Sequence, residues 1–460
     1  MTVDVLDLSG SLAFVDEMYA QFRADPTSVD PSWAAMFGAA GATPSNGHAR
    51  PTAPPAAPSV ASGNGHGRPG AVTMAPLAAT GAASAWPLVN AFRSRGHLAA
   101  DLDPLGLVER VAVSELDPAT WGFAGADLTR TIAPTGVHGL PAATGAELVR
   151  VLRETYCGTI GVESAHIDSP AKRTWLAERM ETRRLRAPDP AVRRRTLEQL
   201  IGAEGFERFC HVKYPGTKRF SLEGSEAFIP ALDLILTHGA RLGAIEAVIG
   251  MAHRGRLTTL EQIMQRAARE IFAEFEDIEP EALSGGGDVK YHQGYSSDRV
   301  DPNGNHLHLS LAFNPSHLEA VDPVVVGRVR AKQRRHGDYE RRKVMGILVH
   351  GDAAFAGQGL VTEVLQLHNL AGYRTGGTVH VIVNNQVGFT ASPHESRSTP
   401  YATDVAQMIQ CPIWHVNGED LDAVADVCEM AMEYRAAFAT DVVIDLYCYR
   451  KYGHNESDEP

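Results

Sequence analysis

The sequence has few cysteines, and none at a spacing that suggests a disulfide framework or a zinc site. Its 5 cysteines lie singly along 460 residues, and no two of them form a C-x-x-C pair. Scattered cysteines in odd number argue against a disulfide-stapled secreted domain and against a cysteine zinc site. We therefore expect a protein of a reducing compartment.

The sequence also lacks the apolar length and the positive charge that membranes and nucleic acids select. No apolar run reaches the length of about 18 residues that a spanning helix needs. The formal net charge is -13 at pH 7. The N-terminus, MTVDVLDLSGSLAF, has acidic residues and no basic region, so we expect no signal or transit peptide. These features predict a cytoplasmic protein that binds neither nucleic acid nor membrane.

Charged and large side chains are nearly absent from residues 39–85, where Ala, Gly, Pro, Ser and Thr dominate. Such a segment buries too little apolar surface to offset its ordering entropy, so we expect a flexible tether. Before it, Phe14, Met18 and Phe22 recur at the spacing of one helix face. We expect residues 1–38 to form a helical docking arm. The alternative is a helical pair packed on its own domain.

From residue 86 onward the composition is that of a globular protein. Residues 86–190 read as mainly helical, and beyond them short apolar strands alternate with helices. The predicted strands are 245–252, 344–349, 378–383, 411–416 and 441–449, and the predicted helices between or after them are 258–275, 358–373 and 421–438. This alternation predicts an α/β domain over 191–460, with a parallel sheet covered by helices on both faces.

Polar residues follow several of these strands directly. His253, Arg254, Asp352 and Asn385 all lie at strand ends, where ligands bind in parallel α/β sheets. A carboxylate, an amide oxygen and a backbone carbonyl form a hard oxygen set suited to Mg²⁺ or Ca²⁺. Mg²⁺ is commonly shared with substrate phosphates, and Arg254 would suit a phosphate. The alternative is that Asp352 only caps a helix starting near Gln358.

The G-D-x and N-N pair resembles the thiamine-diphosphate motif, in which Asp, Asn and a backbone carbonyl hold Mg²⁺ on the diphosphate. The usual third glycine of that motif is Ala353 here. Outside residues 39–85 the chain resembles the E1 component of the 2-oxoglutarate dehydrogenase complex. The segments that carry this resemblance are RGHLAADLDPLGL, YCGTIGVESAHI, KRFSLEG, GMAHRGRL, GDVKYHQGYSSD, FNPSHLEAVDPVV, HGDAAFAGQG, VNNQVGFT, RSTPYATDVA and CYRKYGHNESDEP.

The resemblance implies a thiamine-diphosphate-binding fold and a set of site residues. It implies Mg²⁺ bound by Asp352, Asn385 and the carbonyl of Val387, with Arg254 and Ala353 also beside thiamine diphosphate. It implies that His253 and His292 bind 2-oxoglutarate and assist its decarboxylation, with Ser296 near the distal carboxylate. The implied activity is oxidative decarboxylation in the tricarboxylic acid cycle, with succinyl transfer to the lipoyl group of the E2 succinyltransferase, on which the N-terminal arm docks.

Members of that family are longer than this chain, and their remaining part carries a pyrimidine-binding domain with the glutamate that activates the cofactor. We therefore expect residues 1–460 to be an N-terminal portion that is catalytically silent alone and belongs to a homodimer when full length. Two alternatives remain. One is a non-catalytic module that docks on E2 and binds cofactor, and the other is an E1 acting on a related 2-oxo acid such as 2-oxoadipate.

Overall fold

The computed structural model describes residues 84–108, 110, 112–276 and 289–459, together with four residues near the N-terminus, Phe22, Arg23, Asp25 and Thr27. The chain divides into two compact units, Met1–Ala71 and Val72–Pro460. In the first unit Phe22 and Arg23 are helical, and the Asp25 carboxylate accepts the Thr27 backbone N–H at 2.9 Å. The rest of the predicted docking arm and nearly all of the predicted tether lie outside the described residues, so both stay predictions.

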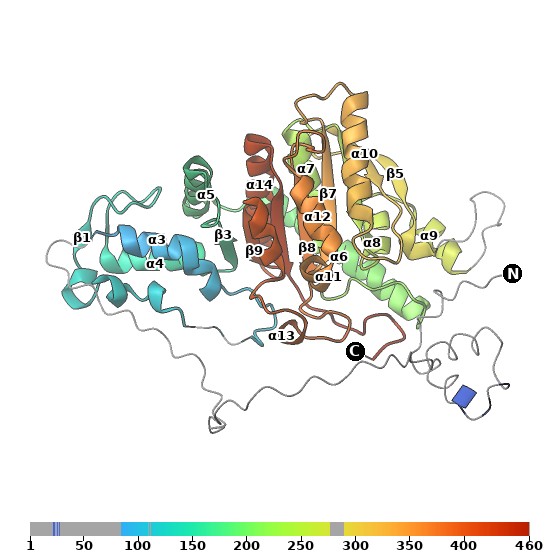
Figure 1. The fold of residues 1–460 in the computed structure, drawn as a ribbon, viewed down its shortest axis with the longest axis horizontal. Coiled ribbons are helices and arrows are strands. Elements are labelled where there is room, and N and C mark those ends of the chain that lie inside the picture. The colour runs from blue at the N-terminus through green and yellow to red at the C-terminus, as the bar shows by residue number, and fades with distance from the viewer. Residues whose placement is uncertain are drawn as a thin grey trace, which may run out of the picture. The chain divides into compact units, whose positions relative to one another are not determined.

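An eight-stranded sheet organises the second unit (Figure 1). In spatial order its strands are β3 (Ile160–Glu163), β9 (Ile413–Asn417), β10 (Val442–Tyr447), β8 (Thr378–Asn384), β7 (Val344–Gly351), β4 (Glu246–Met251), β6 (His306–Leu311) and β5 (Tyr295–Val300). All pairs from β9 across to β6 are parallel, and the edge strands β3 and β5 run antiparallel to their neighbours. Every predicted strand is present, and the predicted parallel α/β sheet is confirmed.

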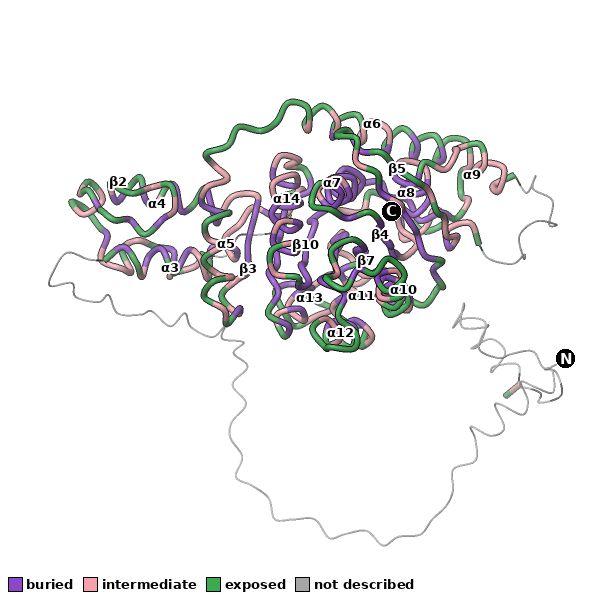
Figure 2. The backbone as a smooth tube through the Cα atoms, turned by 90° about the horizontal axis from the view of Figure 1, so that it is seen from above, coloured by how far each residue is buried: buried purple, intermediate pink, exposed green. Residues whose placement is uncertain are grey.

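Helices cover both faces of this sheet (Figure 2). The first face packs on α6 (Pro190–Lys213), α7 (Phe228–Arg241), α8 (Arg256–Gln262) and α14 (Leu421–Phe438), and the second on α10 (Val321–Arg335), α11 (Asp352–Gly357) and α12 (Gly359–Leu367). In β4, Ala247 and Ile249 enter the core of the first face, whereas Val248 enters that of the second. Burial on both faces explains why the strands read as continuous apolar runs.

The predicted helices agree with the structure best where no backbone irregularity intervenes. The predicted helix 421–438 coincides with α14. The predicted helix 258–275 is split into α8 and α9 (Ala268–Phe275), because Gln265 between them has a left-handed φ of 57°. A residue in that conformation cannot continue a right-handed helix. The predicted helix 358–373 ends earlier, at Leu367 of α12.

The region before the sheet contains three α-helices, and it also supplies a strand to the sheet. Its helices are α3 (Trp86–Arg95), α4 (Gly145–Tyr156) and α5 (Pro170–Arg183), with a small hairpin of β1 (Thr131–Ile132) and β2 (Ala143–Thr144). The short helices of the unit are η2 (Gly96–Ala99), η3 (Ser114–Leu116), η4 (Pro118–Trp121), η5 (Gly125–Leu128), η6 (Lys290–His292), α13 (Pro393–Ser396) and η7 (Ala402–Ile409). Since β3 pairs with β9, the sheet extends into the region predicted to be helical, and the domain boundary at residue 190 stays a prediction.

All five cysteines are free thiols. Within the described parts of the chain, no helix combines the length and the apolar character that crossing a membrane would require.

Candidate active site

A cavity lies at the carboxyl ends of β4, β7 and β8. Its lining includes His253 and Arg254 after β4, Asp352 and Ala353 after β7, and Asn385 and Val387 after β8. This is the edge at which parallel sheets bind ligands. The structure therefore brings six of the predicted site residues together in one cavity.

Asp352 is the first residue of α11, and its side chain is buried at the cavity wall. Burial raises the pKa of this carboxyl, and the charge of Arg397 opposes that shift. The Arg397 Nη1 atom lies 3.5 Å from Asp352 Oδ2. The alternative role of Asp352 as the cap of the helix near Gln358 is wrong, because Gln358 itself precedes α12 and Asp352 begins the separate helix α11.

Arg397 was not predicted as a site residue, although it opens the RSTPYATDVA segment. Its Nε and Nη1 atoms are buried and have no hydrogen-bond partner among the described residues. These two guanidinium nitrogens lack a hydrogen-bond acceptor, and the ion pair between Arg397 and the Asp352 carboxylate is long, at 3.5 Å. An added divalent cation with an anionic oxygen ligand would satisfy both. The donor set therefore fits a metal bound together with a phosphate group.

The two asparagines after β8 have different partners. Asn384 is buried, and its Nδ2 donates to Asp445 Oδ1 at 3.0 Å within the sheet. Asn385 lines the cavity, and its Oδ1 accepts the Val387 backbone N–H at 3.3 Å. Of the two asparagines, only Asn385 lines the cavity, and its predicted role as a metal ligand stays a prediction.

Ala353 replaces the glycine of the general motif, and the residue that faces it is Gly388. A Cβ built on Gly388 would lie 2.6 Å from the Ala353 Cβ, which is too close for any side chain. The methyl group of Ala353 therefore occupies the space that glycine leaves at 388. The turn that carries Asn385 and Val387 can approach Ala353 of α11 because position 388, at the contact, is a glycine.

His253 lies against aromatic rings at the cavity. Its ring centroid is 3.8 Å from that of Phe220 and 5.9 Å from that of His454. Burial lowers the pKa of His253 to about 3, and the neighbouring charges of Arg254 and His454 add to this shift. The imidazole is therefore neutral near pH 7, where it can donate one hydrogen bond and accept another. Phe220 and His454 were not predicted individually, although both lie in segments that carry the resemblance.

Arg254 ties two loops together at the cavity wall. Its Nη1 donates to the Ser221 carbonyl and its Nη2 to the His454 carbonyl, each at 2.8 Å. Burial lowers the pKa of Arg254 to about 10, with the charge of Arg450 adding to it. Its predicted contact with the diphosphate stays a prediction.

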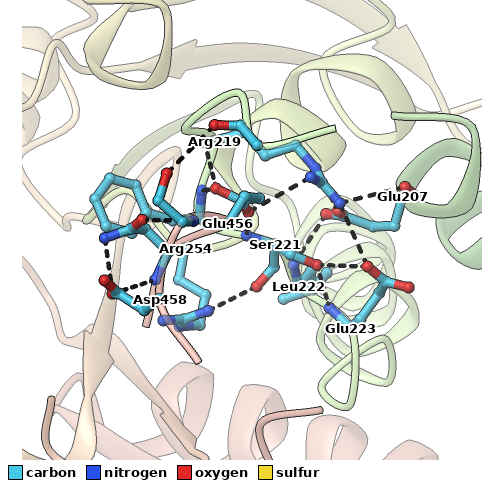
Figure 3. A network of polar contacts seen from close by, with 12 residues as sticks. Glu207, Arg219, Ser221, Leu222, Glu223, Arg254, Glu456 and Asp458 are labelled. Atoms are coloured by element: carbon cyan, nitrogen blue, oxygen red, sulfur yellow. Dashed lines mark hydrogen bonds and ion pairs between the residues drawn. The ribbon is translucent and has the colours of Figure 1, made fainter. Parts of the chain in front are cut away.

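The loop at Ser221 is held by an unusual clamp (Figure 3). The Glu456 carboxylate accepts the backbone N–H groups of Arg219, Phe220 and Ser221 at 2.7, 3.1 and 2.8 Å. Consecutive N–H groups that converge in this way form an anion-binding concavity, and Phe220 takes the left-handed φ of 56° that such a turn uses. The side chain of Arg219 is buried beneath, among three carboxylates.

His292 and Ser296 do not line this cavity. His292 is buried in η6, and it contributes to lowering the pKa of His253, so the two rings lie in electrostatic reach. Ser296 lies on the edge strand β5, where its hydroxyl is 3.3 Å from that of Ser310. Their predicted roles with the substrate stay predictions.

A cluster of two carboxyl groups and His350 lies beside the cavity, which His350 itself lines. The ligand atoms of Glu319, Asp322 and His350 all lie within 4.8 Å of one another. However, Glu319 Oε2 is only 2.5 Å from His350 Nδ1, which suits a shared proton. Two ligands of one metal ion stand about 3 Å apart or more at ordinary metal–ligand distances. Burial raises the pKa of Glu319 and of Asp322 to about 7, so each carboxyl is partly protonated near neutral pH.

The comparisons with known proteins agree with this geometry. Residues 200–460 match the family described as dehydrogenase E1 component. The chain belongs to the dehydrogenase E1 component family. The resemblance inferred from the sequence motifs is thereby confirmed at the level of the family, and residues 9–43 of this E1 chain also match a family described as 2-oxoglutarate dehydrogenase N-terminus.

Relatives of this E1 chain occur in Brucella canis, Brucella abortus and Brucella melitensis, where each is named 2-oxoglutarate dehydrogenase E1 component. Each is 45% identical to this chain over 98% of its length and 50% of the relative's. The E1 chain therefore spans about half the length of the curated relatives it matches.

A charged histidine is buried in the sheet of the E1 chain, close to the asparagine turn. His415 Nε2 lies 2.9 Å from Glu163 Oε1, and its Nδ1 lies 2.8 Å from Asp445 Oδ2. Burial lowers the pKa of His415, but the hydrogen bonds and charges of Asp445 and Glu163 outweigh burial and raise it to about 9. His415 is therefore protonated at neutral pH and joins β3, β9 and β10.

Replacing His415 with glutamine should remove a pH-dependent part of the stability. The folded pKa of about 9 exceeds the unfolded value, so this contribution is complete below about pH 6.5 and is lost as the pH rises through 9. We expect His415→Gln to lower the free energy of unfolding by about 3 kcal/mol at pH 6 and to flatten its pH dependence between pH 6.5 and 9. Urea unfolding across that range measures both. The control is the same substitution at the half-exposed His308. If the free energy of unfolding of His415→Gln depended on pH as that of the parent does, the charge assigned to His415 would be contradicted.

Proposed function

We propose that this E1 chain forms the thiamine-diphosphate- and Mg²⁺-binding part of a 2-oxoglutarate dehydrogenase E1 component. The proposed reaction is the oxidative decarboxylation of 2-oxoglutarate, followed by succinyl transfer to the lipoyl group of an E2 succinyltransferase. The observation that carries the proposal is that Asp352, Asn385 and Val387 line one cavity. Beside Asp352 lies the Arg397 guanidinium, two nitrogens of which lack a hydrogen-bond acceptor among the described residues. The names of the Brucella relatives support the choice of substrate.

The residues at the strand ends would divide the binding of the cofactor between them. The Asp352 carboxylate, the Asn385 amide oxygen and the Val387 carbonyl would bind Mg²⁺ as hard oxygen ligands. Arg397 would neutralise a diphosphate oxygen, which gives its two open nitrogens an acceptor. Arg254 and Ala353 would lie along the same wall. When bound, thiamine diphosphate supplies the electron sink that loss of CO₂ from a 2-oxo acid requires.

The aromatic side of the cavity would serve the substrate. His253 stays neutral because of burial and nearby cations, so it can donate a hydrogen bond to an anionic substrate without an ion pair. An incoming carboxylate would raise its pKa toward the range in which it exchanges protons. Phe220 and His454 pack around it and exclude water from one side. His292 and Ser296 would approach the distal carboxylate of 2-oxoglutarate.

The same proposal covers the partners and the place of the E1 chain in the cell. Residues 1–38 would dock on the E2 succinyltransferase through a helical arm, and residues 39–85 would tether this arm to the folded unit. The match of residues 9–43 to a 2-oxoglutarate dehydrogenase N-terminus supports the docking role. We place the protein in the cytoplasm, as a homodimer in the tricarboxylic acid cycle.

Calorimetry with thiamine diphosphate tests the proposal on the chain as it stands. With Mg²⁺ present we expect one cofactor bound per chain, and with the metal removed by EDTA we expect the heat of binding to vanish, because the metal neutralises the diphosphate charge. Titration with thiamine monophosphate is the control, since it offers fewer phosphate oxygens to the metal. Absence of Mg²⁺-dependent binding would contradict the proposed cofactor site.

A further inference from the structure

One residue in the proposed metal-binding turn has a backbone conformation that its side chain disfavours. Gln386 stands between Asn385 and Val387, and its φ is 61°. In this left-handed region the Cβ of a non-glycine residue crowds the following carbonyl. Such residues persist only where their surroundings hold them, and they concentrate at functional sites. A glycine would adopt this φ at no steric cost, so the glutamine side chain must contribute something else.

The side chain of Gln386 is held by two acceptors from distant parts of the chain. Its Nε2 donates to Asp103 Oδ1 at 3.0 Å and to the Cys448 carbonyl at 3.1 Å. Asp103 belongs to the loop after η2, and its carboxylate is itself fixed by the backbone N–H groups of Leu105, Leu107 and Val108. The amide of Gln386 therefore joins the turn both to the region before the sheet and to the end of β10.

The backbone of Gln386 is held as well. Its N–H donates to Asn384 Oδ1 at 3.2 Å, while Asn384 Nδ2 donates to Asp445 Oδ1 at 3.0 Å. Asp445 in turn holds the charged His415. The Cys448 backbone N–H donates to the Asn384 carbonyl at 2.8 Å, which closes the connection between β8 and the end of β10. Both the main chain and the side chain of Gln386 are therefore anchored, whereas Asn385 and Val387 on either side line the cavity.

We propose that Gln386 is a positioning residue for the metal. Its side-chain amide donates hydrogen bonds to Asp103 and the Cys448 carbonyl. These bonds keep Gln386 in the left-handed conformation that presents the Asn385 amide and the Val387 carbonyl to one cavity. This inference rests on the proposed function. It assigns Asp103, more than two hundred residues away in sequence, to the support of the metal site. Ligand geometry is commonly fixed by such outer hydrogen bonds, whose loss costs about 10- to 100-fold in metal affinity.

Replacing Gln386 with glycine separates this role from a merely structural one. Glycine relieves the strained φ but removes both side-chain hydrogen bonds. We expect Gln386→Gly to have the melting temperature of the parent. We expect it to bind Mg²⁺ about 10- to 100-fold more weakly in the presence of thiamine diphosphate, as measured by calorimetry. The control is Ala439→Gly at the end of α14, where φ is 51° and the same strain is relieved outside the cavity lining. This control should bind Mg²⁺ as the parent does.

A second pair of variants tests the contact with Asp103 directly. Gln386→Glu places a carboxylate against the oxygens of Asp103 and Cys448, so we expect a larger loss of Mg²⁺ affinity. Adding Asp103→Asn restores a donor opposite that carboxylate and should recover part of the affinity. If the parent binds Mg²⁺ and thiamine diphosphate and Gln386→Gly binds them within twofold, the positioning role is overturned and the proposed function stands. If the parent binds neither, both fall.

Discussion

Replacing Asp352 with alanine is expected to abolish Mg²⁺-dependent binding of thiamine diphosphate while leaving the fold intact. Asp352 is the only carboxylate among the six predicted residues that line the cavity. Loss of an outer hydrogen-bond partner already costs about 10- to 100-fold in metal affinity, so loss of the charged ligand itself should exceed about 100-fold. Calorimetry with and without Mg²⁺ measures the affinity. Asp352→Asn, which keeps an oxygen but not the charge, should bind with intermediate affinity.

The folded chain should tolerate this loss. Burial raises the pKa of Asp352, which means that its ionised form is disfavoured by the surroundings of the side chain. Removing it also leaves the buried Arg397 without its partner charge, so we expect a loss of stability of at most about 3 to 5 kcal/mol in a chain that still folds. The matched control is Asp322→Asn, a buried carboxyl in the first turn of α10 that does not line the cavity. We expect that control to bind cofactor normally. Unchanged binding in Asp352→Ala would reduce Asp352 to the first residue of α11 with no ligand role.

The sheet and its binding edge were predictable because one physical constraint governs both. Strands buried on two faces must be apolar along their length, as β4 and β7 are, so they stand out in the sequence. Polar residues that follow such strands directly, such as Asp352 and Asn385, must then lie at the carboxyl edge. The prediction of a shared site needed only the order of strands and helices along the chain, and no knowledge of side-chain packing.

The residues that were missed depend on contacts between distant segments. Arg397 reaches Asp352 from a loop with no regular pattern, and Phe220 meets His253 only because the loops at 219–221 and 454–458 are clamped together. The strand β3 was read as part of a helical region because it has only four residues and gains its partner, β9, from far along the chain. Periodicity within a segment carries no information about such pairings.

The left-handed residues were equally invisible to pattern reading. Gln265, which splits a predicted helix, and Gln386, which shapes the asparagine turn, are residues with ordinary propensities in unusual conformations. The conformation of Gln386 is held by hydrogen bonds to distant parts of the fold, namely to Asp103 and Cys448. The sequence therefore predicts which groups reach the cavity better than it predicts what holds them in place.

Replacing Arg219 with methionine is expected to be strongly destabilising. The guanidinium is buried, with Nε 3.3 Å from Glu207 Oε2, Nη2 3.3 Å from Glu223 Oε2 and Nη1 3.6 Å from Glu456 Oε1 (Figure 3). Removing the cation that contacts all three carboxylates leaves buried charges without their nearest counter-ion, which costs about 3 to 5 kcal/mol. Urea unfolding measures the loss. The exposed pair of Arg194 and Glu198 provides the control, since Arg194→Met should cost less than about 0.5 kcal/mol.

The pH dependence of that loss distinguishes a missing charge from a packing defect. Burial raises the pKa of Glu207, and Arg219 is the largest influence that opposes this shift. Without Arg219 the pKa of Glu207 should rise further, so the folded variant retains a proton that the unfolded chain releases above about pH 4.5. Stability is then lost as the pH rises through the folded pKa, and Arg219→Met should be more destabilised at pH 8 than at pH 5. A loss of equal size at both values would point to packing alone.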